Sequence, residues 1–368
     1  MILKELRIRY FKNYESVDFF FHPQLNLISG NNGMGKTNIL DAIYFMAFGK
    51  SYYSISDKKL IHFDHVKDDS AFFRIESIDE VDCHYVFSFN ALRKKVVSKD
   101  KQVYDKISEH IGNIPLVSIF PEDIDIIKGD SSIRRRFIDN TICQSDREYL
   151  RALLYYNKVL KRKRELLKQF SMRYEDKILL LKKYDFELSQ PAAIIIQKRS
   201  EFLTTFNSLL TDFYHRICNA DLETVLAKYK VSIEEEGYLE AVENQRKNEI
   251  QRGRALVGPH KDDIDFQLMG QSAKYYSSQG QQKSILFALK LAQYEYIRSV
   301  IDRKPLLLLD DIFDKLDQNR IDNLMDLLRG ESFGQIFITD TDAMRIQEAA
   351  EKADFKFLNF NIREGKQV

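Results

Sequence analysis

The stretch Gly30-Asn31-Asn32-Gly33-Met34-Gly35-Lys36-Thr37 decides the fold that the sequence predicts. Its spacing matches the G-x-x-x-x-G-K-[ST] pattern of phosphate-binding loops. Glycines let the backbone turn tightly, so that amide N–H groups and the start of the next helix point at phosphate oxygens. We expect Lys36 to reach the β and γ phosphates of ATP and the Thr37 hydroxyl to bind Mg²⁺. The alternative interpretation is a glycine-rich turn that binds nothing.

The residues on either side of this loop support the first interpretation. Leu25-Asn26-Leu27-Ile28 predicts a short strand before the loop. After it, apolar residues recur every three or four positions from Ile39 to Phe48, which predicts an amphipathic helix that Gly49 ends. A strand, a phosphate loop and a helix follow one another in the order that such a site needs.

A second motif lies far along the chain. Leu306 to Leu309 form an apolar run, typical of a central parallel strand, and Asp310-Asp311 follow directly. We expect Asp310 to hold Mg²⁺ through water and Asp311 to polarise the attacking water. Many strands end in Asp, so this motif is informative only together with the loop. Because one metal ion must join both, the sequence predicts a single nucleotide-binding head that is split by an insert.

A third motif, Ser277-Ser278-Gln279-Gly280-Gln281-Gln282, opens a predicted helix from Gln281 to Val300. Ser278, Gly280 and Gln281 at a helix start would form a second anion site. One head does not need two γ-phosphate sites, so we expect two copies to pair head to tail, with Ser278 of one on the ATP of the other. The alternative is an ordinary serine N-cap.

The rest of the chain predicts an α/β fold, an ABC-type P-loop ATPase head with a mixed sheet and an antiparallel meander. The meander covers about residues 71 to 98, where apolar and polar residues alternate. An inserted, mostly helical lobe follows, with helices of ~25–30 residues that would span about 40 Å. We expect the first half of the head at 1–130, the helical arm at 131–254 and the second half of the head at 255–368.

Composition limits the function. The 368 residues contain 56 Lys and Arg against 55 Asp and Glu, so DNA binding would require a local patch rather than overall charge. The three cysteines fit neither a disulfide framework nor a zinc site and favour a reducing, cytoplasmic compartment. No apolar run approaches ~18 residues, so the sequence predicts no transmembrane helix.

In order along the chain, these motifs resemble the ABC-type heads of the SMC/Rad50 class and, within it, the RecF family. The blocks that carry the resemblance are Leu6 to Tyr14, Asn32 to Tyr44, Phe120 to Asp123, Arg134 to Asp139, Gly258 to Asp263, Ser278 to Gln282 and Asp310 to Asp317. They span almost the whole chain, whereas the middle helical region has no specific match.

The resemblance implies an ATP-dependent DNA-binding recombination mediator that acts in gap repair near the nucleoid. Such a protein dimerises on ATP, binds double-stranded DNA, gapped DNA or junctions, and promotes RecA loading with RecO and RecR. It implies nucleotide-binding roles for Lys36 and Thr37, metal binding by Asp310, a hydrolytic role for Asp311 and a trans signature serine at Ser278. Asp317 would belong to the D-loop at the dimer seam.

The chain departs from the transporter-type pattern, and the shorter Asp311 and the missing switch histidine predict a weak, switch-like Mg²⁺-dependent ATPase. Nuclease activity is not expected. Pro121-Glu122-Asp123 stands where a Q-loop glutamine is usual, and Asp340 stands where transporter heads place a switch histidine. Asp311 is also shorter than the usual Glu. His260 lies beside Asp262 and Asp263, and we expect a hydrogen-bonded structural turn there rather than a metal site.

Candidate DNA contacts lie where basic residues gather. Lys158 to Lys183 contains ten Lys and Arg against three Asp and Glu. The run Lys161-Arg162-Lys163-Arg164 is the main candidate, with Arg134 at the root of the arm as a further one. The alternatives are a solvated helix face for the run and ion pairs inside the protein for Arg134.

Four other functions compete with this reading. Another SMC/Rad50-type ATPase clamp would share every motif. An overcoming-lysogenization-type ATPase nuclease needs a C-terminal nuclease domain, for which the 57 residues after Asp311 leave no room. A transporter ATPase subunit predicts a shorter chain, a Q-loop glutamine and a switch histidine. A small-molecule P-loop kinase would need no serine-type second anion site.

Overall fold

The structure is a computed structural model, and it describes residues 1–66, 71–90, 93–169, 171–218, 223–233, 237–311, 318–330 and 332–367. The chain forms two compact units. The first contains Met1–Asp123 and Lys290–Val368 with a few residues near the end of the longest helix. The second contains Ile124–His215 and Ala220–Leu289. Residues 255–289 therefore group with the helical unit, whereas the sequence assigned them to the head; the functional division of the chain stays a prediction.

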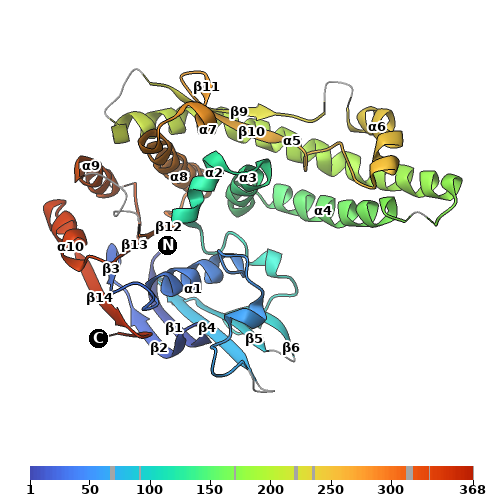
Figure 1. The fold of residues 1–368 in the computed structure, drawn as a ribbon. Helices are drawn as coiled ribbons and strands as arrows, with labels where there is room; N and C mark the ends of the chain where they lie inside the picture. The colour runs from blue at the N-terminus through green and yellow to red at the C-terminus, as the bar shows by residue number, and fades with distance from the viewer. Residues whose placement is uncertain are drawn as a thin grey trace. The chain divides into compact units, whose positions relative to one another are not determined.

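The first unit contains two sheets (Figure 1). The antiparallel sheet has the strand order β2 (Tyr14–Phe20), β1 (Leu3–Phe11), β4 (Phe72–Asp79), β5 (His84–Asn90), β6 (Arg93–Lys99) and β7 (Gln102–Val103). Strands β4 to β6 confirm the predicted meander. In β5, Tyr85 and Phe87 are buried while His84 and Val86 are partly exposed, which is the expected alternation of a sheet with one covered face.

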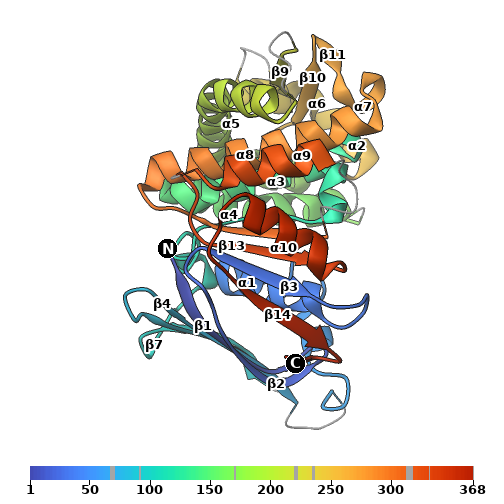
Figure 2. The same ribbon diagram turned by 90° about the vertical axis from the view of Figure 1, so that its left-hand side faces the viewer.

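The second sheet carries the two nucleotide motifs. Its order is β15 (Lys366–Gln367), β14 (Phe357–Arg363), β3 (Leu25–Ser29), β13 (Ile336–Asp340), β12 (Leu306–Asp310) and β8 (Leu116–Ile119). Strands β14, β3, β13, β12 and β8 are parallel, and only β15 is antiparallel. The apolar run of β12 has neighbours on both sides and is fully buried, as predicted. Strand β13 lies inside the sheet, between β12 and β3 (Figure 2), because β14 adds beyond β3.

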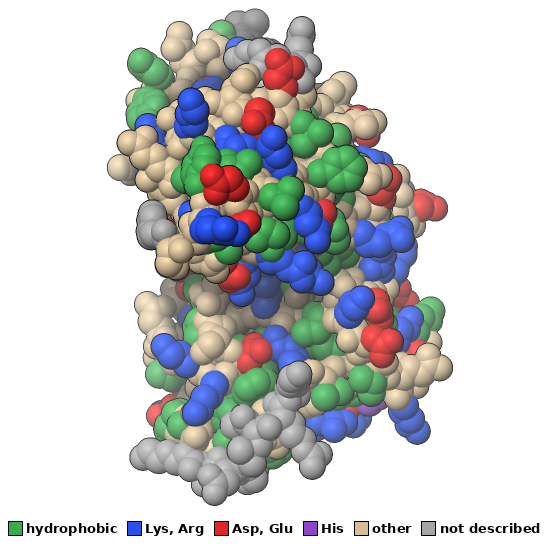
Figure 3. All heavy atoms as spheres, turned by 90° about the vertical axis from the view of Figure 1, so that its right-hand side faces the viewer, with side chains coloured by type: hydrophobic (Ala, Val, Ile, Leu, Met, Phe, Trp, Pro, Cys, Tyr) green, Lys and Arg blue, Asp and Glu red, His purple; other side chains and the backbone are tan. Residues whose placement is uncertain are grey.

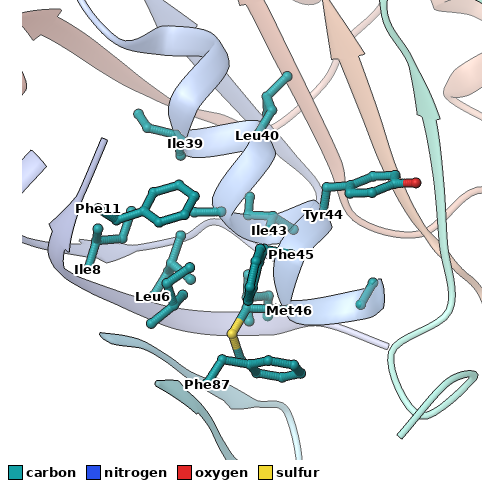
Figure 4. Packing of buried hydrophobic residues seen from close by; sticks show 14 of the residues in the cluster. Leu6, Ile8, Phe11, Ile39, Leu40, Ile43, Tyr44, Phe45, Met46 and Phe87 are labelled. Carbon is teal, nitrogen blue, oxygen red and sulfur yellow. The ribbon is translucent and has the colours of Figure 1, made fainter. Parts of the chain in front are cut away.

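Helix α1 (Lys36–Phe48) packs within the main core of the first unit. Apolar residues of α1 contact side chains from β1 and β5 (Figure 4), and the same cluster includes residues of β3, β12, β13 and β14. Gly49 ends the helix in the left-handed conformation, with φ 64°, as predicted. Helices α9 (Gln318–Leu328) and α10 (Ala343–Lys352) belong to the same unit, as do short 3₁₀ helices at Asp57–Leu60 and Ile107–Glu109.

The second unit is mostly helical. Its helices are α2 (Asp125–Lys128), α3 (Ser131–Ser145), α4 (Arg147–Leu167), α5 (Tyr174–Cys218), α6 (Tyr238–Arg252) and α7 (Ala273–Tyr276). A small antiparallel sheet joins β11 (Gln271–Ser272), β10 (Asp263–Leu268) and β9 (Val225–Lys230). Helix α8 (Gln279–Ile301) begins in this unit and continues into the first one.

The expected helix lengths in the arm were wrong. Helix α5 has 45 residues and contains Pro191, which does not end it. At 1.5 Å per residue it extends about 67 Å. Proline removes one backbone donor, but Pro191 is buried in this unit, and neighbouring buried residues such as Leu188, Ala192 and Ile195 provide packing that stabilises the helix through the break.

None of the helices in the described part of the chain combines the length and apolar character needed to cross a membrane.

Candidate ATP site of the first unit and serine turn of the second

The phosphate loop connects β3 to α1. The Lys36 ammonium folds back into the loop and donates to the carbonyl oxygens of Gly30, at 2.8 Å, and Asn31, at 3.2 Å. Its charge is therefore held inside the curve of the loop, where phosphate oxygens would accept hydrogen bonds from it. The predicted geometry of the loop, a strand followed by a tight turn and a helix start, is present.

Two glycines of the loop are required by close contacts. Gly30 has φ +147°, and a Cβ there would lie 2.4 Å from the Ile362 carbonyl oxygen. Gly35 has φ +111°, and a Cβ there would lie 2.4 Å from Nδ2 of Asn13. Any side chain at either position would collide with a neighbouring element as well as strain the backbone.

Neighbouring elements anchor the outside of the loop. Asn13 Nδ2 donates to the Met34 carbonyl at 3.2 Å, and the Tyr14 hydroxyl donates to the Gly35 carbonyl at 3.1 Å. The Gly365 N–H, in the turn between β14 and β15, also donates to the Met34 carbonyl at 3.1 Å. These contacts leave the inner amides of the loop available while they fix its outer carbonyls.

The two distant motifs meet at the carboxyl ends of β3 and β12. The Thr37 hydroxyl donates to Oδ1 of Asp310 at 3.1 Å, and the Thr339 hydroxyl donates to the same oxygen at 2.6 Å. A hydroxyl and a carboxylate are the hard oxygen ligands that Mg²⁺ prefers, so Thr37 and Asp310 fit the metal that the motifs imply. In the described part of the chain no group of three His, Cys, Asp or Glu could hold a metal.

The environment of Asp310 disfavours its charged form. The side chain is 2% exposed, and burial, with the nearby charges of Asp311 and Glu122, raises its pKa to about 6. A divalent cation would reverse this balance because it stabilises the carboxylate directly. The elevated pKa therefore agrees with a metal-binding role.

Thr339 also positions Asp311. The sequence motifs predicted Asp311 but did not identify Thr339 as a residue of the site. The Asp311 N–H donates to both the carbonyl and the hydroxyl of Thr339, at 3.2 and 3.1 Å, and Asp311 has φ 45°. One threonine thus holds the metal carboxylate through its side chain and the next residue through its backbone. Its place at the end of β13, beside β12, could have been a sequence signal only if the strand order had been known.

The segment after β8 contributes further acidic groups. Burial and the charges of Asp310 and Glu122 raise the pKa of Tyr53. Glu122 lies in the short 3₁₀ helix Pro121–Ile124. This segment stands where transporter heads have the Q-loop glutamine. Its neighbour Asp123 is buried and pairs with Lys290 of α8 at 2.9 Å, which fixes this turn within the first unit.

Asp340 stands one residue beyond Thr339 and is fully buried. Arg345 donates to both of its carboxylate oxygens, at 2.8 and 2.7 Å. A carboxylate engaged in this way is already paired with a cation. The position that holds a switch histidine in transporter heads is therefore part of an ion pair here.

The serine turn in the second unit is a capping box. The Gln281 N–H donates to Ser278 Oγ at 3.2 Å, and the Ser278 N–H donates to Gln281 Oε1 at 3.0 Å. The alternative reading of Ser278 as a helix cap is thus confirmed. Ser278 is also exposed at the start of α8, and Gly280 and Gln281 are partly exposed, so a role toward a second copy stays a prediction.

Two of the predicted DNA contacts are wrong. Lys163 is fully buried between Asp185 and Glu249, at 2.7 Å from each. Arg134 is buried and donates to both carboxylate oxygens of Asp263, at 2.8 and 3.0 Å. Burying a cation is tolerable only with such partners, and these partners occupy the donors that a phosphate would need. Lys161, Arg162 and Arg164 are exposed.

His260 occupies a structural turn, as expected. Its Nδ1 lies 2.7 Å from the Tyr156 hydroxyl. Burial, together with the charges of Arg164 and Lys261, lowers its pKa to about 3, so the ring is neutral. The D-loop residue Asp317 lies outside the described residues.

Known proteins are similar to this chain over almost its whole length. The family model described as RecF/RecN/SMC N terminal domain matches residues 2–360. The protein named DNA replication and repair protein RecF from Phocaeicola vulgatus is 37% identical over 371 residues, covering 100% of this chain and 98% of that protein. The protein of the same name from Porphyromonas gingivalis is 36% identical over 368 residues, covering 100% and 99%.

Solved structures agree. A structure described as the recombination mediator protein RecF-ATP in the RecFOR pathway has a TM-score of 0.85 and 29% identity, covering 100% of this chain and 97% of that one. An Smc head domain from Pyrococcus furiosus has a TM-score of 0.55 at 16% identity, which shows a shared fold alone. The phosphate loop, the Thr37–Asp310 contact and these full-length matches together show that the chain belongs to the RecF family of the RecF/RecN/SMC N-terminal domain proteins.

Proposed function

We propose that this chain is an ATP-dependent, DNA-binding recombination mediator that dimerises when ATP binds. The observation that carries the proposal is the contact of Thr37 with Asp310 beside the phosphate loop. It joins the two halves of one ATP site, and the solved relative that the chain matches over 100% of its length is described as a complex with ATP. A recombination mediator of this kind would act on DNA in the cytoplasm.

Within this site, each residue has a definite task. The amides of Gly30 to Gly35 and the Lys36 ammonium bind the phosphates, while the Thr37 hydroxyl and the Asp310 carboxylate hold Mg²⁺. The ion supplies charge neutralisation of the phosphates when bound. Asp311 orients the attacking water. Thr339 holds the Asp310 carboxylate and the Asp311 backbone in place, which lets a small movement at β13 change the site.

The ATPase is expected to be slow. Asp311 is one methylene shorter than the usual glutamate. At the position of the switch histidine the chain has Asp340, which is paired with Arg345. Both features reduce proton transfer near the γ-phosphate. Turnover well above ~1 s⁻¹ would contradict a switch-like role. Nuclease activity is not expected.

The proposed partners are double-stranded, gapped or junction DNA, a second copy of this chain, and RecO, RecR and RecA. The solved relative is described as part of the RecFOR pathway, which supports RecO and RecR as partners. Ser278, exposed at the start of α8, is the residue that would contact ATP bound to the second copy.

Light scattering with and without ATP and Mg²⁺, before and after addition of duplex DNA, tests the proposal. We expect a monomer without nucleotide and a dimer with it. Ser278→Arg should abolish the dimer while each monomer still binds ATP. Ser200→Arg is the matched control, because Ser200 is exposed on α5 and its hydroxyl bonds to the Ile196 carbonyl of its own helix. ATP-driven dimers of Ser278→Arg would refute the trans site.

A further inference from the structure

One face of α4 carries a line of basic side chains. The exposed residues that recur along it at helical spacing include six Lys or Arg, namely Arg147, Arg151, Lys158, Lys161, Arg162 and Lys168. Glu165 is the acidic residue within this line. From Arg151 to Lys168 the helix rises about 26 Å, so the line extends over several nucleotide lengths.

The central charges of this line have no carboxylate partner among the described residues. Lys158, Lys161 and Arg162 form no ion pair with any residue that the structure describes. The Arg151 Nε donates to the Arg147 carbonyl of its own helix at 3.1 Å. By contrast, the acidic residues Asp185 and Glu249 are used internally by Lys163. The α4 line therefore presents a positive potential to solvent.

Exposed aromatic rings lie next to this line. A groove of about 480 Å³ between α4 and α5 is lined by Tyr155 and Phe186 together with Arg151 and Gln190. Phe186 is 72% exposed and Tyr155 is 47% exposed, although both are large apolar rings. Of the two carboxylates that also line the groove, Glu148 lies 3.5 Å from Lys198, and Glu187 is half-buried.

Figure 3 looks onto the end of the unit formed by α4 and α5. Lys and Arg side chains lie there beside hydrophobic side chains, with acidic side chains among them.

From this combination, we infer that the α4–α5 face binds single-stranded nucleic acid, with bases stacked on Tyr155 and Phe186 and phosphates on Arg151, Lys158 and Arg162. A single strand offers flat bases and regularly spaced anions at once, and such sites usually cover ~4–16 nucleotides. A purely apolar peptide would leave the basic line unmatched. The inference rests on the proposed DNA function and adds the surface that would engage the unpaired strand of a gap.

Binding of two labelled oligonucleotides, measured by fluorescence anisotropy, tests it. One is oligothymidine and the other is an abasic strand with the same phosphates. Wild-type protein should bind oligothymidine more tightly. Tyr155→Ala/Phe186→Ala should weaken oligothymidine binding at least about fivefold and leave abasic binding unchanged, because stacking needs the bases.

The charges are tested separately. Lys158→Glu/Arg162→Glu should weaken both strands and lower the salt slope by about 1–2. The control for the rings is Phe20→Ala, an aromatic ring 64% exposed on β2. The control for the charges is Lys128→Glu/Lys228→Glu, two exposed lysines on α2 and β9, outside α4 and α5.

Photo-crosslinking from 5-iododeoxyuridine, followed by peptide mapping, locates the contact. Crosslinks on the peptides with Tyr155 or Phe186 support the inference. Equal binding of the two oligonucleotides by wild type, or unchanged oligothymidine binding by the ring variant, overturns it and leaves a protein partner as the occupant. In that case intact ATP-driven dimers and duplex binding would show that the proposed function itself still holds.

Discussion

The Thr37 hydroxyl lies 3.1 Å from Oδ1 of Asp310, although the two residues are 273 positions apart in the chain. This contact exists because β3 and β12 are both parallel partners of β13, so their carboxyl ends lie at one edge of the same sheet. Thr339, at the end of β13, stands between them and bonds to Asp310.

Thr339→Val tests the link between the two carboxylates. Valine keeps the shape but removes the hydroxyl that donates to Asp310 and accepts from the Asp311 N–H. We expect ATP hydrolysis to fall about 10- to 100-fold, because the Asp310 carboxylate and the Asp311 backbone lose their fixed positions. Stability should fall by about 1–2 kcal/mol. Steady-state ATPase assays and thermal unfolding measure both effects, with Thr204→Val on α5 as control; equal activity of the two variants would contradict the role.

Asp310→Asn tests the elevated pKa. Because the pKa is raised to about 6 in the folded protein, the folded state binds the proton more tightly than the unfolded chain does. Metal-free stability should therefore decrease as pH rises from about 4 to about 6, and the cost should persist above that window. Asparagine still accepts the Thr339 hydrogen bond and carries no charge.

We expect the metal-free Asp310→Asn variant to be more stable than wild type at pH 7.5, by at most about 2–3 kcal/mol, and the gain to vanish below about pH 4. Urea unfolding with EDTA at several pH values measures it. Hydrolysis should be lost at every pH. A stability gain that grows toward low pH would have the wrong sign for this explanation.

Lys36→Arg tests the phosphate contact. Arginine keeps the charge, but its planar fork cannot enter the loop as the ammonium does between the carbonyls of Gly30 and Asn31. We expect ATP binding to be retained and hydrolysis to be impaired at least about tenfold. Equilibrium binding of a fluorescent ATP analogue and single-turnover hydrolysis separate the two effects. Full hydrolysis with the arginine would show that only the charge matters.

Lys163→Met tests the buried cluster in the helical unit. Removing this cation leaves Asp185 and Glu249 with an uncompensated buried charge, although Arg246 still pairs with Asp185. The expected loss of stability is about 3–5 kcal/mol. Lys161→Met, at an exposed position on the same helix, should change stability by less than about 0.5 kcal/mol. Chemical unfolding of both variants measures the difference, and similar values would mean that Lys163 is not part of the core.

This contrast also decides which lysines and arginines of α4 suit variants that test DNA binding. A charge reversal at Lys163 would place a carboxylate among Asp185 and Glu249, so lost DNA binding would report unfolding rather than a missing contact. Lys158 and Arg162 are the appropriate positions, because both are exposed on α4.

The sequence by itself determined the features that depend on neighbouring residues. The loop Gly30 to Thr37 needs glycines at fixed positions, α1 follows from the spacing of its apolar residues, and β12 follows from four consecutive leucines. The serine turn is equally local, since Ser278 and Gln281 cap one helix start. Each of these patterns is short and periodic, so it is visible without knowledge of the rest of the chain.

Only the tertiary structure decided which charges are exposed and which residues meet. Lys161 and Lys163 look alike in the sequence, yet one is in solvent and the other is buried, because acidic partners come from α5 and α6. Thr339 reaches Asp310 because of strand order, and α5 continues through Pro191 because of packing. Burial and pairing depend on contacts between residues far apart in the chain, and local sequence patterns do not specify which distant residues meet.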